Sequence, residues 1–275
     1  MSKFILITGC STGIGYTCAH GLQKLGYTVF ATCRKVEDVK RLKAEGLNAF
    51  RLDLYDSTSM HEALAWMLSQ TGGRIDVLFN NGAYGQPGAV EDLKRNVLRE
   101  QFETNVFGTQ ELTNLVLPYM RTQKNGRIIY NSSILGFVAM SYRGAYNASK
   151  FAIEGLADTM RLELHGSGVE VILIEPGPIR SHFRKNALAK FLEHIDQKNS
   201  AHQEVYAKTL RRLEGSGDAP FTLSAEAVLD VLIKAIEAKK PKARYGVTFP
   251  TKLFAVLKRI FPTTMMDYVA RKAGE

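Results

Sequence analysis

The sequence predicts an α/β fold in which a doubly wound parallel sheet is covered by helices on both faces, within a single domain of 275 residues. Three observations support this prediction. Short apolar runs typical of buried strands alternate along the chain with amphipathic stretches typical of helices. A glycine-rich loop follows the first apolar run directly. The chain is 45% apolar, which is enough for a substantial core. In such a sheet, ligands bind beyond the carboxyl ends of the strands.

The first strand-helix unit contains a phosphate-binding pattern. Residues 4–8 read as a buried strand, and an amphipathic helix reaches about residue 25. Glycines between them let the backbone approach a pyrophosphate, and the following helix offers free N–H groups and a positive dipole end. We expect this Rossmann-type loop to hold a dinucleotide rather than to be only a tight turn. Its candidate cofactor-binding residues are Gly9, Ser11, Thr12, Gly13, Ile14 and Gly15.

The second strand, at 27–33, indicates which dinucleotide binds. A carboxylate about 20 residues beyond the glycines would hydrogen-bond the 2′-hydroxyl of NAD and repel a 2′-phosphate. Here Cys33 stands in that neighbourhood and Arg34 follows it. Because an arginine fork holds a phosphate, Arg34 predicts NADP. The alternative is that Arg34 is an ordinary solvated charge.

The alternation of strands and helices continues to residue 175. We expect strands at 48–54, 75–79, 127–131 and 169–174, and helices at 57–70 with a Ser cap, at 93–120 with a polar interruption around Asn105, and at 146–165. The strand ends supply further candidate site residues. These are Asp53 and Leu54, then Asn81, Gly82 and Ala83, then Ser132 and Ser133, and finally Pro176, Gly177, Ile179 and Ser181.

Tyr146 and Lys150 are four residues apart and therefore share one face of a helix. Lowering the tyrosine pKa from about 10 by roughly three units requires about 4 kcal/mol of preference for the phenolate. An exposed ion pair supplies only about 0 to 1 kcal/mol. Lys150 can do this only in a partly buried site with help from another positive group, such as an oxidised nicotinamide ring. The alternative is an exposed Tyr and Lys on a helix.

Substrate selection is expected in the segment 179–224, where two helical stretches, 181–197 and 201–213, replace strands. A segment of this length over a strand end is often a lid. Its apolar residues, together with others expected nearby, predict a pocket for an apolar aldehyde, ketone or alcohol, although they could simply pack the lid on the body. These residues are Phe183, Leu188, Phe191, Leu192, Ile195, Tyr206 and Leu210 of the lid, and Tyr84, Phe137, Val138, Met140 and Tyr142 outside it.

The chain continues with a helix at 225–238, a candidate edge strand at 244–249 and a helical extension at 251–272. In the helix at 251–261, apolar residues fall on one side and Lys252, Lys258 and Arg259 on the other. A basic amphipathic helix can lie on an anionic membrane surface. We favour the alternatives for so short a helix, which are closure of the substrate pocket or packing on another subunit.

Charge and cysteine content exclude several classes of protein. The net charge is +9, but residues 234–275 hold ten Lys or Arg against three acidic residues, so this tail carries +7 of it. The rest lacks an Arg-rich stripe, zinc-finger spacing or RNA-reading pattern, which argues against nucleic-acid binding. Cys10, Cys18 and Cys33 have no metal-ligand spacing and are odd in number, so we expect no metal site and no disulfide framework. Without a membrane-spanning or signal-like run, we expect a cytoplasmic protein.

Taken together, these motifs resemble the short-chain dehydrogenase/reductase family over residues 3–183. The loop reads Thr-Gly-x3-Gly-x-Gly from Thr8 to Gly15, and Ser133 precedes Tyr146 by the usual thirteen residues. The branch containing 17-beta-hydroxysteroid dehydrogenases, retinol dehydrogenases and bacterial NADP-dependent aldehyde reductases is especially similar. The sequence departs from the family pattern in two ways: Gly82-Ala83 reverses the usual Ala-Gly, and Ser181 replaces a threonine that often contacts the nicotinamide amide.

The resemblance implies a catalytic group of Asn105, Ser133, Tyr146 and Lys150. Tyr146 would exchange a proton with the substrate oxygen while NADP(H) exchanges hydride. Ser133 would orient that oxygen, Lys150 would lower the tyrosine pKa and hold the nicotinamide ribose, and Asn105 would hold a water linked to Lys150. The resemblance also implies a homodimer or homotetramer. Two alternatives stay open: a non-catalytic NADP(H) sensor, and a membrane-surface lipid, retinoid or steroid dehydrogenase that uses its C-terminal helix.

Overall fold

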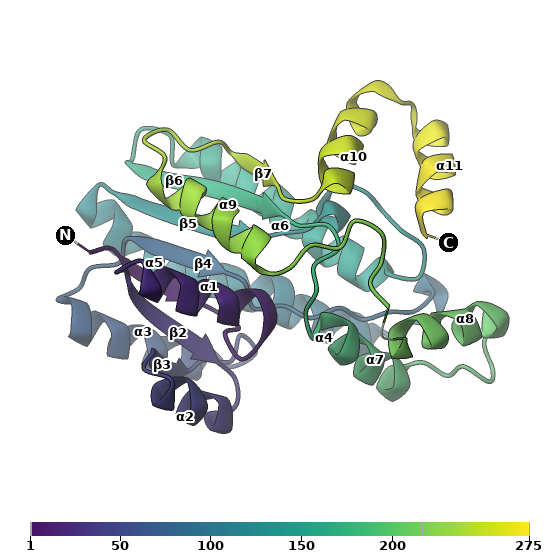
Figure 1. Ribbon diagram of the computed structural model, residues 1–275, viewed down its shortest axis with the longest axis horizontal. Helices are drawn as coiled ribbons and strands as arrows, with labels where there is room; N and C mark the ends of the chain where they lie inside the picture. Colours follow the sequence, from purple (N-terminus) through teal and green to yellow (C-terminus); the bar gives the residue numbers. More distant parts are fainter. Residues whose placement is uncertain (1, 216, 275) are drawn as a thin grey trace.

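The computed structural model describes residues 2–215 and 217–274, and a seven-stranded parallel sheet lies at its centre (Figure 1). The strands lie in the order β3-β2-β1-β4-β5-β6-β7, so the winding reverses between β1 and β4. The predicted doubly wound α/β fold is confirmed. The strands are β1 (Phe4–Ile7), β2 (Thr28–Cys33), β3 (Asn48–Arg51), β4 (Val77–Asn80), β5 (Gly126–Asn131), β6 (Val169–Glu175) and β7 (Arg244–Gly246).

Helices cover both faces of the sheet. α1, α2 and α9 pack on one face and α3, α5 and α6 on the other (Figure 1). Side chains alternate along each strand, so Ile5 and Ile7 of β1 face the first layer while Leu6 faces the second. The helices are α1 (Gly13–Lys24), α2 (Val36–Ala44), α3 (Ser57–Thr71), η1 (Val90–Asp92), α4 (Arg95–Phe102), η2 (Glu103–Gly108), α5 (Thr109–Gln123), η3 (Ile134–Gly136), α6 (Gly144–Glu163), α7 (Phe183–His194), α8 (Gln203–Glu214), α9 (Glu226–Glu237), α10 (Phe249–Ile260) and α11 (Thr263–Gly274).

The strand arrows in Figure 1 point toward the side of the molecule where α7, α8, α10 and α11 lie. α7 and α8 form a separate apolar cluster with the start of α4, in which Phe191, Ile195 and Tyr206 are buried. These three residues therefore pack the helices onto the body of the protein. For them, the alternative to lining a substrate pocket holds. The region beyond the strand ends, where ligands bind in such sheets, lies between this pair of helices and the C-terminal pair.

α10 and α11 follow the edge strand β7 at the end of the chain. Phe254 of α10 is buried against Ile134, Leu135 and Val138 of the η3 region. Ile260, by contrast, is 68% exposed. The amphipathic helix therefore buries only part of its predicted apolar side in this chain. Of the helices within residues 2–215 and 217–274, none is long and apolar enough to cross a membrane.

Three local features differ from the expectations or sharpen them. α3 is capped by Asp56, whose carboxylate accepts a hydrogen bond from the Ser59 amide at 3.2 Å, so the predicted Ser cap is wrong. Ser57 is already helical, and a carboxylate also suits the positive end of the helix. α2 is an additional helix that buries only Val39 and Leu42. The interruption predicted around Asn105 is a π-helix, η2.

Candidate active site

Ser133, Tyr146 and Lys150 line one cavity of about 1340 Å³ at the carboxyl ends of the strands. α6 places the Lys150 ammonium 5.7 Å from the centre of the Tyr146 ring. Lys150 is only 5% exposed and donates a hydrogen bond to the main-chain oxygen of Asn131 at 2.6 Å. The alternative of an exposed Tyr and Lys pair is therefore wrong. The two side chains face a shared, partly enclosed space.

Burial shifts the pKa values of this pair in opposite directions, upward for Tyr146 and downward for Lys150. Burial raises the pKa of Tyr146 to about 12, and a hydrogen bond with Ser133 opposes the rise only in part. Burial also lowers the pKa of Lys150 to about 8, against the influence of Glu154, which raises it. The expected lowering of the Tyr146 pKa is thus not provided by the protein residues, because desolvation of the phenolate outweighs their help. At neutral pH Tyr146 is a protonated hydroxyl that can donate.

Asn105 lies in the π-helix and is 2% exposed. Its Oδ1 accepts from the Tyr84 amide at 3.1 Å, and its Nδ2 donates to the Tyr84 carbonyl at 2.9 Å and to Ser149 Oγ at 3.1 Å. Both amide hydrogens are therefore used, and the side chain clamps the loop after β4 to α6. If Asn105 holds a water beside Lys150, as expected, it does so by accepting a hydrogen bond through its side-chain or main-chain oxygen.

The loop after β1 fits a pyrophosphate. Gly9 has a φ of +71°, and a Cβ there would lie 2.8 Å from Gly82 Cα. Gly13 has a φ of +60° and lies directly against Ser181. Thr12, the N-cap of α1, makes no side-chain hydrogen bond to the helix, and the first turn has no acidic residue. The helix N-terminus thus presents its N–H groups and positive dipole end to the cavity.

A hydrogen-bond network fixes this loop to the neighbouring strand ends. Thr8 Oγ1 accepts from the amides of Asn81 (3.0 Å) and Gly82 (2.8 Å), and Asn81 Nδ2 donates to the Thr8 carbonyl at 2.9 Å. Asn131 Nδ2 donates to Asn81 Oδ1 at 2.9 Å. Since Asn131 also accepts from Lys150, the network joins the loop to the candidate catalytic pair. The reversed Gly82-Ala83 therefore leaves this turn intact.

The structure brings most of the predicted site residues to one cavity. Besides the three residues named first, the cavity is lined by Gly9, Ser11, Thr12, Gly13, Ile14, Asn81, Gly82, Ala83, Pro176, Gly177, Ile179 and Ser181. Five predicted residues do not line it: Gly15, Arg34, Asp53, Leu54 and Asn105. Gly15 instead permits close packing, because a Cβ there would lie 2.3 Å from the Gly9 oxygen.

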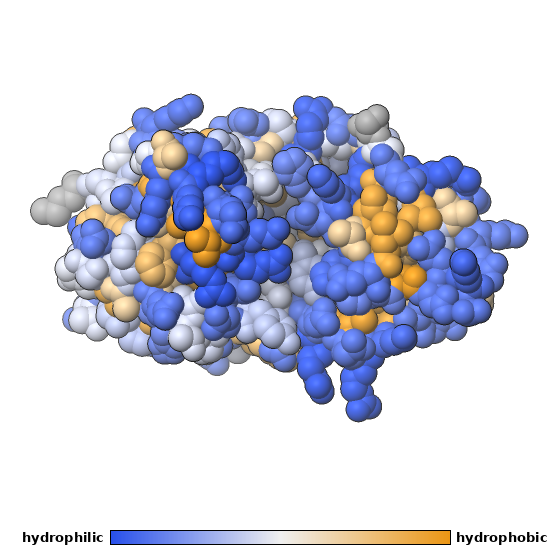
Figure 2. Space-filling model, turned by 90° about the horizontal axis from the view of Figure 1, so that it is seen from below, coloured by the Kyte–Doolittle hydropathy of each residue, from blue (hydrophilic) through white to orange (hydrophobic). Residues whose placement is uncertain are grey.

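The second half of the cavity lies between α7–α8 and the C-terminal helices. Phe183 packs edge-on against Tyr146, with 5.2 Å between ring centres. Seen from below, the surface is hollowed between the two halves of the molecule, with apolar side chains gathered on the α7 side (Figure 2). Of the residues expected outside the lid segment, only Met140 lines the cavity; Tyr84, Phe137, Val138 and Tyr142 do not. Tyr142 packs instead on Tyr206.

Several cavity residues were not predicted. Arg143, Arg184 and Arg212 line the substrate half, and Asn131 holds Lys150. Arg41 of α2 donates to the main-chain oxygen of Ser11 at 2.6 Å, beside the glycine loop. Arg143 could have been suspected of lying near the site because it stands three residues before Tyr146. The sequence does not show whether its side chain points into the cavity.

Comparisons with known proteins agree with this geometry. A family model described as short chain dehydrogenase matches residues 3–191. The chain is 38% identical over 270 residues to the uncharacterized oxidoreductase YbbO of Escherichia coli strain K12, covering 98% of this chain and 94% of that protein.

Two further relatives have more specific names. The chain is 33% identical to the 3-ketodihydrosphingosine reductase of Bacteroides thetaiotaomicron, covering 98% of this chain and 97% of that protein. It is 31% identical to the NADPH-dependent 3-dehydrocapnine reductase of Ornithobacterium rhinotracheale, covering 98% and 96%. Among solved structures, a short-chain dehydrogenase from Streptomyces avermitilis is similar with a TM-score of 0.77 and 27% identity, covering 98% of each chain.

Proposed function

This chain belongs to the short-chain dehydrogenase/reductase family, and from that premise we propose that it is an NADP(H)-dependent oxidoreductase that interconverts a carbonyl and an alcohol on an apolar substrate. One observation carries the proposal. Ser133, Tyr146 and Lys150 line a cavity that runs from the glycine loop, which fits a pyrophosphate, into an apolar chamber. A substrate in that chamber meets the tyrosine hydroxyl.

In the proposed reaction, Tyr146 donates its proton to the carbonyl oxygen, and in the reverse direction it accepts one from the alcohol. The loop at Gly9 to Ile14 would hold NADPH, which would supply the hydride when bound. Ser133, which is hydrogen-bonded to Tyr146, orients the substrate oxygen. The Lys150 ammonium, 5.7 Å from the tyrosine ring, stabilises the phenolate left behind. Because the pKa of Tyr146 is about 12, the resting hydroxyl is protonated and can donate to a carbonyl oxygen.

We propose NADP(H) rather than NAD(H) because of the positive charge of Arg34. Arg34 directly follows β2, is exposed, and has no carboxylate within ion-pair distance among the described residues. Its guanidinium is therefore free to hold a 2′-phosphate bidentately. Arg41 adds a second positive charge nearby, although Asp38 and Glu45 pair with it. The Ornithobacterium relative is named as an NADPH-dependent reductase, which supports the same choice.

The chamber supports the proposed substrate class, an apolar aldehyde or ketone. Phe183 and Leu188 of α7 and Leu253 and Phe254 of α10 line it. We further propose that residues 179–224 act as a substrate lid and 251–272 as an extension that completes the pocket. The Bacteroides relative is named for the reduction of a keto compound, which supports a carbonyl substrate. Three buried free thiols support the proposed cytoplasmic location.

The test is a spectrophotometric assay of NADPH and NADH oxidation over medium-chain aldehydes, retinal and ketosteroids. We expect turnover with NADPH that falls by roughly 10² to 10⁴-fold in Tyr146→Phe, because the proton donor is removed. In Arg34→Asp we expect the preference for NADPH over NADH to fall about tenfold or more, because the new carboxylate repels a 2′-phosphate.

Turnover that persists in Tyr146→Phe would contradict the role of the tyrosine. Tight NADPH binding, measured by fluorescence, without reduction of any carbonyl would favour the non-catalytic sensor. An unchanged cofactor preference in Arg34→Asp would remove Arg34 from the cofactor site. Tyr27→Phe provides a control, since it also removes a phenol but one that lies far from the cavity and binds Glu237.

A further inference from the structure

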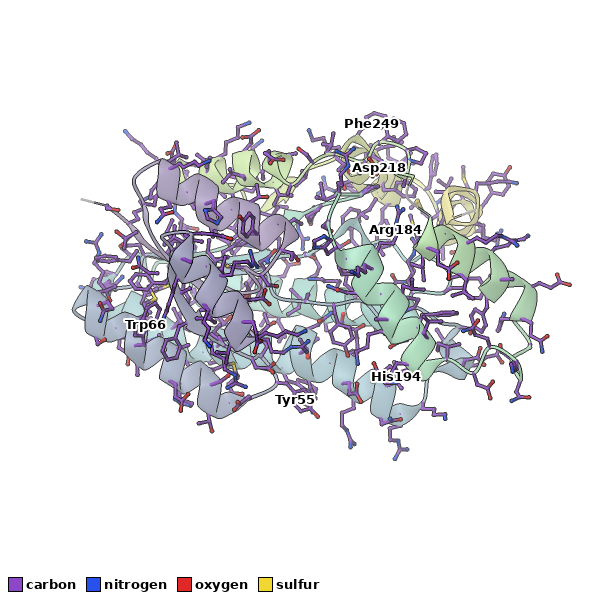
Figure 3. The ribbon with its side chains drawn as sticks, turned by 60° about the horizontal axis from the view of Figure 1, so that its bottom comes forward. Tyr55, Trp66, Arg184, His194, Asp218 and Phe249 are labelled. Carbon is purple, nitrogen blue, oxygen red and sulfur yellow. The ribbon has the colours of Figure 1, made fainter. Side chains whose placement is uncertain are left out.

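The substrate half of the cavity is not uniformly apolar. Its apolar walls come from α7, α10 and the segment before α9, and include Leu188, Phe221 and Leu253. Three arginines from three separate elements line the same space: Arg143 just before α6, Arg184 on α7 and Arg212 on α8. We call these three residues the arginine cluster. Figure 3 shows Arg184 where α7 faces the C-terminal helices, below Phe249 and close to Asp218.

The arginine cluster lacks acidic partners. Arg143 Nη1 lies 2.8 Å from Met140 Sδ, and a thioether is only a weak acceptor. Arg184 Nη1 donates to the main-chain oxygens of Gly215 at 3.2 Å and Gly217 at 2.6 Å. Within residues 2–215 and 217–274, no carboxylate lies at ion-pair distance from any of the three guanidinium groups. None of the three charges is therefore neutralised by an ion pair within that part of the chain, although Asp218 interacts electrostatically with Arg184.

The three guanidinium groups are close enough to repel one another. Burial and, to a smaller extent, the charge of Arg212 lower the pKa of Arg143 to about 10. The surrounding protein and the charge of Arg184 both lower the pKa of Arg212. Such repulsion destabilises the chain unless a ligand relieves it, and uncompensated charges in a cavity are typical of functional sites.

The carboxylates that line the cavity do not neutralise this charge. Among the lining residues only Glu214 and Asp218 are acidic, whereas Lys185 adds to the positive charge of the arginine cluster. Asp218 forms an ion pair with Arg180, and its carboxylate also interacts electrostatically with Arg184. The substrate half therefore has a positive potential next to its apolar walls, and both lie in the same cavity as Tyr146.

We propose that the arginine cluster is an oxyanion subsite of the substrate pocket. It binds a carboxylate, sulfonate or phosphate group that is joined to the apolar chain carrying the carbonyl. Guanidinium forks suit such groups because they bind two oxygens at once and remain charged in a partly buried site. The substrate is then an anionic amphiphile, whose charged group lies at the arginine cluster while its carbonyl reaches Tyr146. This inference rests on the proposed carbonyl chemistry.

The kinetic test compares two substrates of equal chain length: an oxo fatty acid and its neutral methyl ester. We expect wild type to prefer the acid by about tenfold or more in kcat/KM, chiefly through KM. In Arg143→Met and Arg212→Gln we expect this acid-to-ester ratio to fall about tenfold. Arg211→Gln is the matched control, because Arg211 neighbours Arg212 on α8 and is exposed as Arg212 is, but does not line the cavity. It should retain the wild-type ratio.

A binding test does not depend on turnover. Isothermal titration calorimetry with decanoate, decanesulfonate and decyl phosphate, against decanol as the neutral reference, measures the subsite directly. We expect each anion to bind wild type more tightly than decanol and to lose that advantage in Arg212→Gln but not in Arg211→Gln. If the anions bind in this way but no carbonyl is reduced, the proposed function fails while the subsite stands.

Three results would overturn the proposal. The first is equal kcat/KM for acid and ester in wild type together with equal binding of decanoate and decanol. The second is an acid-to-ester ratio in Arg143→Met and Arg212→Gln that equals the ratio in Arg211→Gln. The third is a loss of about tenfold or more in NADPH affinity in those two variants, which would assign the arginine cluster to the cofactor phosphates instead.

Discussion

At the scale of single residues, the electrostatic partner of Lys150 is Glu154, one turn further along α6. Glu154 is 6% exposed, and its Oε1 atom has no hydrogen-bond partner among the described residues. Burial lowers the pKa of Lys150 to about 8 while Glu154 raises it. The charge on Lys150 at physiological pH therefore depends on a carboxylate that does not line the cavity. In the proposed mechanism we expect Glu154 to be a positioning residue that acts on the reaction through Lys150.

This dependence predicts a pH effect. The ammonium form of Lys150 stabilises the phenolate, so kcat/KM for carbonyl reduction should fall as the pH rises through about 8. Glu154→Gln removes the influence that raises the Lys150 pKa, so the fall should begin at a lower pH, by up to roughly one unit. The measurement is a pH–rate profile of NADPH oxidation from pH 5 to 10 for both proteins.

Asp158→Asn is the matched control for this shift. Asp158 shares with Glu154 an ion pair to Arg244, but it is not among the groups that influence the pKa of Lys150. Its profile should keep the wild-type position even if the rate changes. A Glu154→Gln profile that overlies that of wild type would show that Lys150 is not the group that titrates.

The sequence predicts some of these residue contacts and not others. Tyr146 and Lys150 are predicted to be neighbours because helical spacing fixes residues i and i+4 on one face. Asn131 as the acceptor for Lys150 could not be predicted, because it comes from β5 and the pairing depends on how α6 lies on the sheet. The rise of the Tyr146 pKa in the protein alone could not be predicted for a related reason. Desolvation depends on the surrounding protein atoms, which no local motif specifies.

At the scale of elements, the short edge strand β7 holds the active-site helix. Its Arg244 donates through Nη1 to Glu175 at the end of β6 (2.7 Å) and through Nη2 to Asp158 of α6 (2.6 Å), and it also pairs with Glu154. Glu154 and Glu175 are both buried. Arg244 thus pairs with two buried carboxylates and with the partly exposed carboxylate of Asp158. This arrangement ties β6, β7 and α6 together directly behind Lys150.

Arg244→Met should destabilise the protein in a pH-dependent way. Removing one partner of buried charges costs about 3 to 5 kcal/mol, and we expect the lower end because a third of the arginine side chain is exposed. Burial and the charge of Glu154 raise the pKa of Glu175 to about 7, well above about 4.3 in an unfolded chain. The folded state therefore holds an extra proton between about pH 4.3 and 7, and stability falls as the pH rises through that range.

The measurement is urea unfolding of wild type and Arg244→Met at pH 6 and pH 8. At pH 6 Glu175 can stay protonated and the loss of the arginine is tolerated in part, whereas at pH 8 two carboxylates must be buried without a partner. We expect the larger loss at pH 8. Equal losses at the two pH values would show that Glu175 is already ionised at pH 6. Arg161→Met, which removes only an ion pair to Asp158, should cost about 1 kcal/mol or less.

Elements with strong apolar patterns could be predicted, and weakly patterned ones could not. The strands lie within a few residues of their predicted positions because each is a run of buried side chains. α2 was missed because its nine residues bury only Val39 and Leu42. The interruption at Asn105 was expected, but its form follows from a tertiary contact. A Cβ on Gly108 would lie 1.7 Å from the Leu54 oxygen, so the π-helix presses its backbone against the loop after β3.

At the scale of the whole molecule, the strand order brings the site together. β1, β4 and β5 are neighbours in the sheet, so the glycine loop, Asn81 and Asn131 meet at the point where the winding reverses. Alternating strands and helices predict a parallel sheet, but they do not specify this order, because pairing joins strands far apart in the chain. The opening of the chamber between α7–α8 and α10–α11 likewise depends on packing across the molecule.

The outer face of α6 predicts an interface between two copies of the chain. Phe151 and Leu162 are eleven residues apart and so lie on one face of the helix, where they are 41% and 73% exposed. Gly155, between them on that face, is exposed, and a Cβ there would meet nothing within 4 Å. Phe107 and Tyr119, from η2 and α5, are also exposed. An apolar helix face with a small central residue suits close packing on an identical helix, and we expect α6 to form the interface of a homodimer.

Leu162→Asp should therefore dissociate the assembly. In a two-fold interface each substitution appears twice, so two carboxylates would be buried close together without cations, at a cost of about 3 kcal/mol or more. That corresponds to at least a hundredfold weaker association. Size-exclusion chromatography with light scattering at micromolar concentration should show a dimer or tetramer for wild type and a smaller species for the variant. Ile260→Asp is the control, because Ile260 is 68% exposed and belongs to α10 rather than α6. If Ile260→Asp dissociates the protein and Leu162→Asp does not, the copies associate through the C-terminal helices instead.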